Sequence, residues 1–259
     1  MVADTQNGYV TSETHQGITT IEFFHPQSNA LPRKILESLA HEIHAAGRDK
    51  DTRVIVLRSA GEKAFCAGAS FTELSSITNE KEGFDFFSGF ANVINAMRQS
   101  TKLIIGRIHG KCVGGGVGLA AAVDYAIAVE GADVKLSELA IGIGPFVVGP
   151  AVERKIGTSA FTQLAIDASM WRNADWARRK GLYAELHPTA EGMNESVTRL
   201  AHQLARTSPD AMAELKKVMW RGTENWDTLL SDRAEISGRL VTSHFTREAI
   251  EKFKAKATS

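Results

Sequence analysis

A run of three consecutive glycines, Gly114 to Gly116, constrains this chain more than any other feature of its sequence. The run separates an apolar stretch typical of a strand, residues 103–105, from an alanine-rich stretch typical of a helix, residues 119–123. Glycine lacks a Cβ atom, so its backbone adopts conformations closed to other residues and approaches a ligand closely. At the start of a helix, such a turn presents unpaired N–H groups and the positive end of the helix dipole. The sequence therefore predicts a site for an anion, or for an oxygen that becomes anionic during a reaction.

The charge balance and the cysteine usage exclude several classes of function. The 259 residues carry a formal net charge of zero, so we expect no nucleic-acid partner, which would require a basic surplus. Glycines and Asp124 interrupt the longest apolar stretch, residues 112–129, so we expect no membrane span. Cys66 and Cys112 fit neither a metal-binding spacing nor a disulfide framework. With no signal-peptide pattern in the first ten residues, we expect a cytoplasmic protein that binds no metal.

Strand and helix patterns alternate up to about residue 190, and the remainder of the chain is almost entirely helical. Residues 8–24 alternate apolar and polar side chains around Gln16-Gly17, which predicts a hairpin. Further strands are predicted at residues 53–58, 102–108, 125–129 and 132–136. Helices are predicted at residues 32–46, 80–99, 193–205, 209–220, 225–239 and 246–256. This order indicates an α/β core over residues 1–190 and a helical region over residues 191–259.

A second glycine-containing turn, Ala67-Gly68-Ala69, also follows a strand and precedes a helix. If the two strands are close neighbours, one N–H group from each turn converges on a single carbonyl oxygen and forms an oxyanion hole. The glycine triplet alone is also compatible with a simple tight turn. It does not match a dinucleotide-binding motif, because the G-x-G-x-x-G spacing and the following acidic residue are absent.

Several further segments repeat, in order and separation, the motifs of one protein family. They are Asn29-Ala30-Leu31, residues 63–69, His109-Gly110, the glycine triplet, Asp124, Glu138 before residues 139–142, Pro145, and residues 253–256. On these segments the chain resembles the crotonase family, also called the enoyl-CoA hydratase/isomerase superfamily, nearly from end to end. The resemblance implies a crotonase-like spiral of ββα units with a helical C-terminal oligomerisation region. It also implies an acyl-CoA thioester as substrate, with no separate cofactor, and a homotrimer or homohexamer.

The same resemblance assigns the oxyanion hole to the N–H groups of Ala69 and Gly115. These donors would hold the thioester oxygen and stabilise an enolate, which is where stabilisation lowers the barrier. The resemblance also implies contacts with coenzyme A by Lys63, Ala67, Gly68, Gly114 and Lys256.

The acid–base groups depart from the pattern of the family's hydratases, which usually have two glutamates. Gly118 stands at the first glutamate position and cannot transfer a proton, whereas the second position is Glu138. A single carboxylate suffices for a 1,3 proton shift, since it removes a proton at one carbon and returns it at another. We therefore expect double-bond isomerisation by Glu138, whose apolar neighbours in sequence should raise its pKa.

Three alternatives remain open from the sequence. The first is hydration of an enoyl-CoA, such as a methylglutaconyl-CoA-like substrate, with Glu73 as the second acid. The second is another enolate-forming reaction, and the third is a member that binds acyl-CoA without catalysis. The acyl pocket is expected to involve Gly118, Pro145 and Phe146, and the bulky residues after Pro145 replace a glycine pair that the family usually has.

Overall fold

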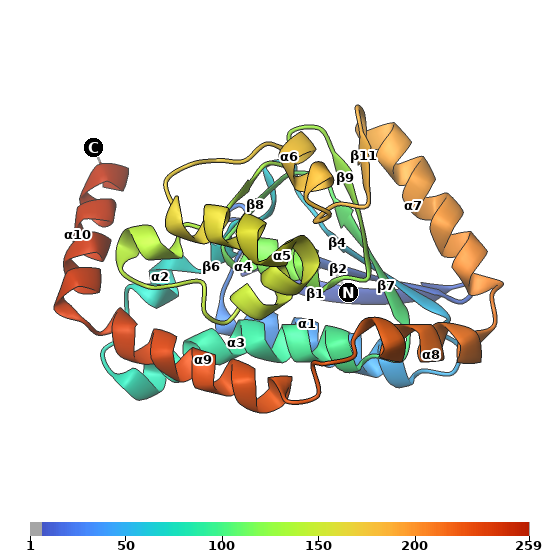
Figure 1. Ribbon diagram of the computed structural model, residues 1–259, viewed down its shortest axis with the longest axis horizontal. Coiled ribbons are helices and arrows are strands. Elements are labelled where there is room, and N and C mark those ends of the chain that lie inside the picture. Colours follow the sequence, from blue (N-terminus) through green and yellow to red (C-terminus); the bar gives the residue numbers. More distant parts are fainter. Residues whose placement is uncertain (1–6, 259) are drawn as a thin grey trace.

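The computed structural model describes residues 7–258, with side chains described through residue 252. Figure 1 shows a central sheet with helices packed around it. The strands are β1 (Tyr9–His15), β2 (Ile18–Phe24), β3 (Ala30–Leu31), β4 (Val54–Ser59), β5 (Ala64–Cys66), β6 (Gly68–Ala69), β7 (Leu103–Ile108), β8 (Lys111–Val113), β9 (Tyr125–Val129), β10 (Val134–Lys135) and β11 (Glu185–His187). The helices are α1 (Arg33–Arg48), α2 (Phe71–Leu74), α3 (Glu80–Gln99), α4 (Gly115–Ala122), the 3₁₀ turn η1 (Glu138–Ile141), α5 (Gly149–Ile166), α6 (Ala174–Arg179), α7 (Ala190–Ala205), α8 (Pro209–Met219), α9 (Trp226–Val241) and α10 (His244–Thr258).

The main sheet has six strands in the order β1-β2-β4-β7-β9-β11. Only β1 and β2 are antiparallel, and they are joined at Gln16 and Gly17, whose positive φ angles form the predicted hairpin turn. The other pairs are parallel, as expected for strands joined through helices. The predicted α/β architecture is therefore confirmed.

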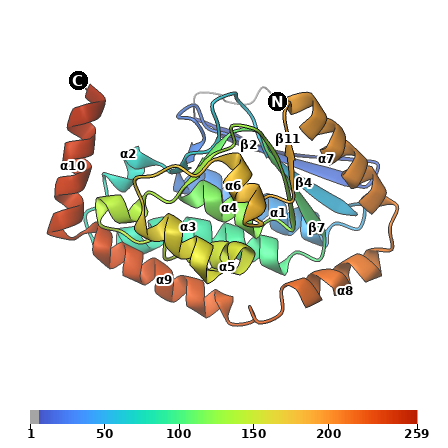
Figure 2. The same ribbon diagram turned by 45° about the horizontal axis from the view of Figure 1, so that its top comes forward.

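Successive residues of β4 point to opposite faces of the sheet, and both faces are covered by other parts of the protein. Val54 and Val56 pack with Met193 and Val197 of α7. Residues on the other face, such as Leu57, join the larger core that α1, α3 and α4 cover. Figure 2 shows α7 at one end of the molecule and α10 at the opposite end.

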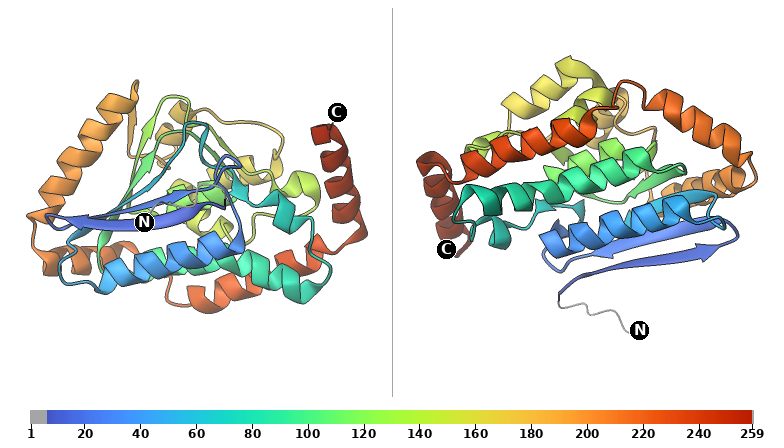
Figure 3. Two further views of the ribbon diagram at one scale, coloured as in Figure 1. Left: turned by 180° about the vertical axis from the view of Figure 1, so that it is seen from behind. Right: turned by 90° about the horizontal axis from the view of Figure 1, so that it is seen from below.

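The C-terminal helices pack on the rest of the protein as well as on each other. Helix α9 lies along α3, which lies along α1, and Figure 3 shows the three as neighbouring rods. A buried ion pair joins α8 to the sheet, because the Lys216 ammonium lies 2.9 Å from Asp124 Oδ2. The Asp124 carboxylate also accepts hydrogen bonds from the Ile104 backbone and from the Trp220 indole. Within the described residues, no helix has the length and apolar composition needed to cross a bilayer.

Two small sheets position the functional site beside the main sheet. One has the order β10-β8-β5, and the other pairs β3 with β6. The glycine triplet follows β8 and opens α4, as the sequence predicts. The ends of β6 and β8 are thereby placed next to each other, and the site is built at this point.

Candidate active site

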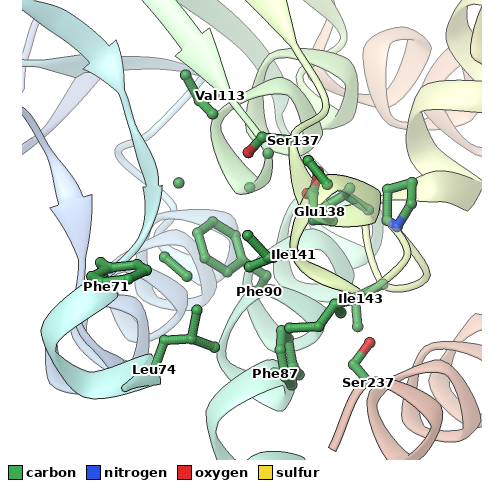
Figure 4. Close-up of a pocket in the computed structure, with 18 of the residues that line it drawn as sticks. Phe71, Leu74, Phe87, Phe90, Val113, Ser137, Glu138, Ile141, Ile143 and Ser237 are labelled. Carbon is green, nitrogen blue, oxygen red and sulfur yellow. The ribbon is translucent and has the colours of Figure 1, made fainter. Parts of the chain in front are cut away.

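A cavity of about 670 Å³ with mainly apolar walls lies beside the turns that follow β6 and β8. Aromatic and aliphatic side chains from α2, α3, η1 and the loop before α5 form most of its wall (Figure 4). Glu138 is the only carboxylate among the described residues that line it. The lining residues include Ala67, Gly68, Ala69, Phe87, Phe90, Val113, Gly114, Gly115, Lys135, Glu138, Pro145, Phe146, Val148 and Lys252.

The two glycine-containing turns lie against each other, as predicted. Gly68 has φ +91°, and a Cβ atom built on it would lie 2.9 Å from the Val113 carbonyl oxygen and 3.5 Å from the Gly115 nitrogen. Only glycine permits so close an approach in this left-handed conformation. Gly115 is the first residue of α4, so its N–H has no acceptor within the helix. Ala69 and Gly115 both line the cavity, and their N–H groups are therefore candidate donors to one oxygen.

The Glu138 carboxylate lies against the second of these turns. A Cβ atom built on Gly114 would be 2.8 Å from Glu138 Oε1. Glu138 Oε2 is buried and has no hydrogen-bond partner, although the residue as a whole keeps some exposed surface. Burial raises the pKa of this carboxyl to about 7, against the opposing effect of backbone N–H groups at Glu138 and Ser137. A carboxyl with this pKa both accepts and releases a proton near neutral pH.

Gly118 does not contribute to the cavity wall in the way the sequence suggested. It is buried in α4, and Val148, which does line the cavity, covers it. A Cβ atom built on Gly118 would lie only 2.5 Å from Val148 Cγ1. The space next to Gly118 is therefore filled by the Val148 side chain, and Gly118 itself is not among the residues that line the cavity. Pro145 and Phe146 do line the cavity.

Glu73 is not placed to act as a second acid. Its Oε2 atom accepts a hydrogen bond of 2.8 Å from the backbone N–H of Arg33, the first residue of α1. A carboxylate is favourable there, because the helix dipole is positive at this end and Pro32 supplies no side-chain cap. Glu73 is also absent from the residues that line the cavity. The alternative in which Glu73 is the second acid therefore gains no support from the position of this side chain.

The residues expected to contact coenzyme A fall into three groups. Ala67, Gly68 and Gly114 line the cavity. Lys63 is exposed on the loop before β5 and does not line it. The side chain of Lys256 lies outside the described residues. Two other lysines, Lys135 and Lys252, do line the cavity. Neither was predicted from the sequence, because neither belongs to a motif.

The site has no arrangement suited to a resident metal ion. Within the part of the chain that the structure describes, no group of three or more His, Cys, Asp or Glu side chains is placed to hold one. Cys66 and Cys112 are buried free thiols, and burial raises the pKa of Cys66 to about 12. The fold and site thus define an α/β protein in which two candidate N–H donors and one buried carboxylate line an apolar cavity.

Comparison with known proteins identifies the family. The family model described as enoyl-CoA hydratase/isomerase matches residues 13–258, so the chain belongs to this family and is an enzyme that acts on an acyl-CoA thioester. The chain is 28% identical to a short-chain-enoyl-CoA hydratase of Clostridium acetobutylicum, over 88% of this chain and 87% of that protein. It is 27% identical to a peroxisomal Delta(3,5)-Delta(2,4)-dienoyl-CoA isomerase of Arabidopsis thaliana, over 85% of each chain.

A solved structure confirms the fold. The chain superposes on an enoyl-CoA hydratase of Bacillus halodurans with a TM-score of 0.86 at 21% identity, covering 94% of this chain and 99% of the other. The predicted crotonase fold is therefore confirmed. The relatives include both hydratases and isomerases, so the family does not by itself fix the reaction.

Proposed function

We propose that this enzyme moves the double bond of an enoyl-CoA thioester, with Glu138 as its single proton carrier. The proposal rests on one observation: the cavity has one buried carboxylate, and an apolar wall occupies the place of a second carboxylate. Glu138 is the only described carboxylate that lines the cavity, and Val148 fills the space beside Gly118. One proton carrier matches a 1,3 proton shift, in which a proton leaves one carbon and returns to another.

The chemistry follows from the positions of the two turns and of Glu138. The thioester oxygen would accept hydrogen bonds from the N–H groups of Ala69 and Gly115. The Glu138 carboxylate would then remove a proton from the acyl chain, and the electron pair of that C–H bond would form an enolate held by the two donors. Returning the proton to a different carbon completes the shift without gain or loss of atoms. Each oxyanion donor is typically worth about 2.7–4 kcal/mol in such a site.

Hydration of an enoyl-CoA is the second candidate, and the resemblance to the Clostridium hydratase favours it. Hydration adds water across the double bond, so a group must hold that water while a proton is delivered to carbon. In hydratases of this family two carboxylates usually share the task. Here the Val148 side chain offers no hydrogen-bonding group at the second position, and the Glu73 carboxylate is engaged at α1. These two contacts make isomerisation the favoured reaction.

Product analysis in water labelled with oxygen-18 separates the two candidates. The enzyme would be given matched 2-enoyl-CoA and 3-enoyl-CoA substrates, and the products would be analysed by mass. Isomerisation interconverts the two substrates with no change of mass and no label. A product heavier by one labelled water would establish hydration and refute the proposal.

We also propose that copies of this chain assemble through the C-terminal helices, in a soluble, cytoplasmic homotrimer or homohexamer. Leu215, Val218 and Met219 of α8 are 52%, 59% and 37% exposed. They occupy positions i, i+3 and i+4, so they share one face of the helix. An apolar helix face of this kind matches the C-terminal region through which relatives of the crotonase family form trimers.

A further inference from the structure

A second cavity, of about 790 Å³, lies between the main sheet and α7, and charged and polar side chains line much of it. Its floor is one face of β1, β2, β4 and β7. Its wall is one face of α7, because the lining residues of this helix recur three and four positions apart, from Asn194 to His202. No described residue lines both this cavity and the one that holds Glu138. The second cavity is called the α7 groove below.

Strand register places two arginines side by side on the floor of the α7 groove. Arg58 of β4 pairs with Arg107 of β7, and Glu22 of β2 pairs with Arg58 on its other side. Neighbouring strands are about 4.8 Å apart, so the two cationic side chains start from adjacent positions on one face. Like charges directly opposite each other destabilise a strand pair. This pair of arginines is therefore unfavourable unless an anion offsets the repulsion.

The protein supplies a close carboxylate to only one of the two arginines. Glu22 Oε2 lies 2.7 Å from the Arg58 guanidinium, and Glu22 Oε1 accepts a hydrogen bond from the Tyr9 hydroxyl. Among the side chains that the structure describes, no carboxylate lies within ion-pair distance of Arg107. Glu13, the other carboxylate of the groove, is on β1, three strands away from β7 and so at about 14 Å.

The surroundings of Arg107 are neutral or positive apart from the more distant Glu22. Its Nε–H donates a hydrogen bond of 2.6 Å to the uncharged side chain of Asn194 on α7. Burial and the charge of Arg58 lower the pKa of Arg107, against an opposing effect of Glu22. An arginine nevertheless stays protonated at neutral pH. The groove therefore contains a half-buried positive charge without a counter-ion of its own.

Ser59 gives an independent indication that the groove has a ligand. This residue ends β4, lines the groove beside Arg58 and is only 3% exposed. Its hydroxyl oxygen is buried and has no hydrogen-bond partner in the described structure. Buried polar groups are nearly always hydrogen-bonded, so a missing partner calls for an explanation. An oxyanion is a suitable partner, because it accepts hydrogen bonds from hydroxyl and guanidinium groups alike.

We propose that the α7 groove binds the phosphate or carboxylate group of a small metabolite, with Arg107 and Arg58 as its charged partners. Both groups are oxyanions whose geometry matches the planar fork of a guanidinium. The bound anion supplies the negative charge that Glu22 alone does not provide for two arginines. Because this groove and the Glu138 cavity are separate, the inference does not depend on the proposed reaction.

Thermal unfolding with simple anions tests the proposal. The Tm of the wild type and of Arg107→Gln would be measured in inorganic phosphate, in acetate, and in sodium chloride at the same ionic strength. A ligand that binds only the folded state raises the Tm. Phosphate or acetate at about ten times its Kd should raise the Tm of the wild type by about 3 °C or more above the chloride reference. Arg107→Gln should lose this rise.

Matched variants separate anion binding from a general effect of charge. Arg206→Gln removes an exposed arginine just after α7 that does not line the groove, and it should keep the full rise. Arg107→Lys keeps the charge without the planar fork, so it should keep part of the rise. It also keeps the test decisive if Arg107→Gln does not fold. The proposal is overturned if neither anion exceeds chloride with the wild type, or if Arg107→Gln keeps the full rise.

The two probes distinguish the two possible ligand groups. A rise with phosphate that acetate does not reproduce assigns a phosphate-bearing metabolite. A rise with acetate at least as large as that with phosphate assigns a carboxylate.

Calorimetric titration measures the binding without unfolding or turnover. The wild type should bind one of the two anions per chain at this groove, and Arg107→Gln should lose that binding. Glu138→Gln should keep it, because Glu138 lies in the other cavity. If the anion binds but no enoyl-CoA is converted, the proposed function fails while the anion site is supported. Equal binding by the wild type and by Arg107→Gln refutes the site.

Discussion

Replacing Glu138 by Gln should stabilise the protein at alkaline pH while it removes the activity. In the native protein, burial raises the pKa of this carboxyl from 4.5 to about 7. Each tenfold change in proton affinity is worth about 1.4 kcal/mol, so holding the ionised carboxylate in the folded state costs about 3 kcal/mol. A neutral amide of the same shape does not carry this cost.

The sign and the pH range of the effect follow from the direction of the pKa change. Between pH 4.5 and about 7 the folded state binds more protons than the unfolded state, because its carboxyl has the higher pKa. The contribution of Glu138 is therefore most favourable at low pH and is lost as the pH rises through about 7. Between pH 5.5 and pH 8.5 the loss amounts to about 2 kcal/mol.

Urea unfolding at a series of pH values gives the free energy of unfolding of the wild type and of Glu138→Gln. The difference between the two values measures the contribution of the Glu138 carboxyl to stability. The variant should be more stable than the wild type at pH 8.5, and its advantage should shrink by about 2 kcal/mol at pH 5.5. For the wild type, kcat/KM should rise with pH through about 7, since the ionised carboxylate is the base. The matched control, Glu73→Gln, should keep its activity. A pH-independent difference in stability, or a variant less stable at pH 8.5, would refute the burial argument.

Three further predictions concern packing, a buried ion pair and assembly. Gly118→Ala should destabilise the fold by about 1–3 kcal/mol in urea unfolding, because the added methyl group meets Val148, and Val148→Ala in the same chain should recover most of the loss. Asp124→Asn should cost about 3–5 kcal/mol in the same assay, because it leaves the buried Lys216 ammonium without its counter-charge. Sedimentation equilibrium should show an oligomer of the wild type, and Leu215→Glu on the exposed face of α8 should dissociate it.

Each of the three predictions has an outcome that contradicts it. If the effects of Gly118→Ala and Val148→Ala on the free energy of unfolding simply add, the methyl group added at position 118 does not clash with Val148. An unchanged unfolding midpoint for Asp124→Asn would show that the buried pair contributes nothing. A wild type that sediments as a monomer at all concentrations would contradict the assembly.

The periodic parts of the fold were predictable from the sequence, because local pattern and tertiary packing agree there. The hairpin turn at Gln16-Gly17 and the helix over residues 80–99 were predicted with their observed bounds. Helix α5 was missed because its apolar pattern is broken, and its residue Gly157 has φ +77° and ψ 158° inside the element. The assignment of residues 191–259 to a separate region stays a prediction, although α7 packs on the main sheet.

The site was predictable where the chemistry depends on backbone turns and not where it depends on side-chain direction. The convergence of the Gly68 and Gly115 turns follows from two similar strand-to-helix connections. The surroundings of Glu73 and Gly118 could not be predicted from the sequence, for a shared reason. Both depend on contacts with residues about 30 to 40 positions away in the chain, which a local pattern does not reveal. Lys135 and Lys252, which line the cavity, were missed because they belong to no motif.

The central claim is that Glu138 alone moves protons on a substrate held by the two turns. Its most direct measurement is the rate at which an enoyl-CoA takes up deuterium from heavy water, followed by NMR at the carbons on either side of the double bond. The wild type and Glu73→Gln should exchange at comparable rates, and Glu138→Gln should be slower by roughly 10²–10⁴-fold. Exchange at the wild-type rate in Glu138→Gln would contradict the claim and require a different proton carrier.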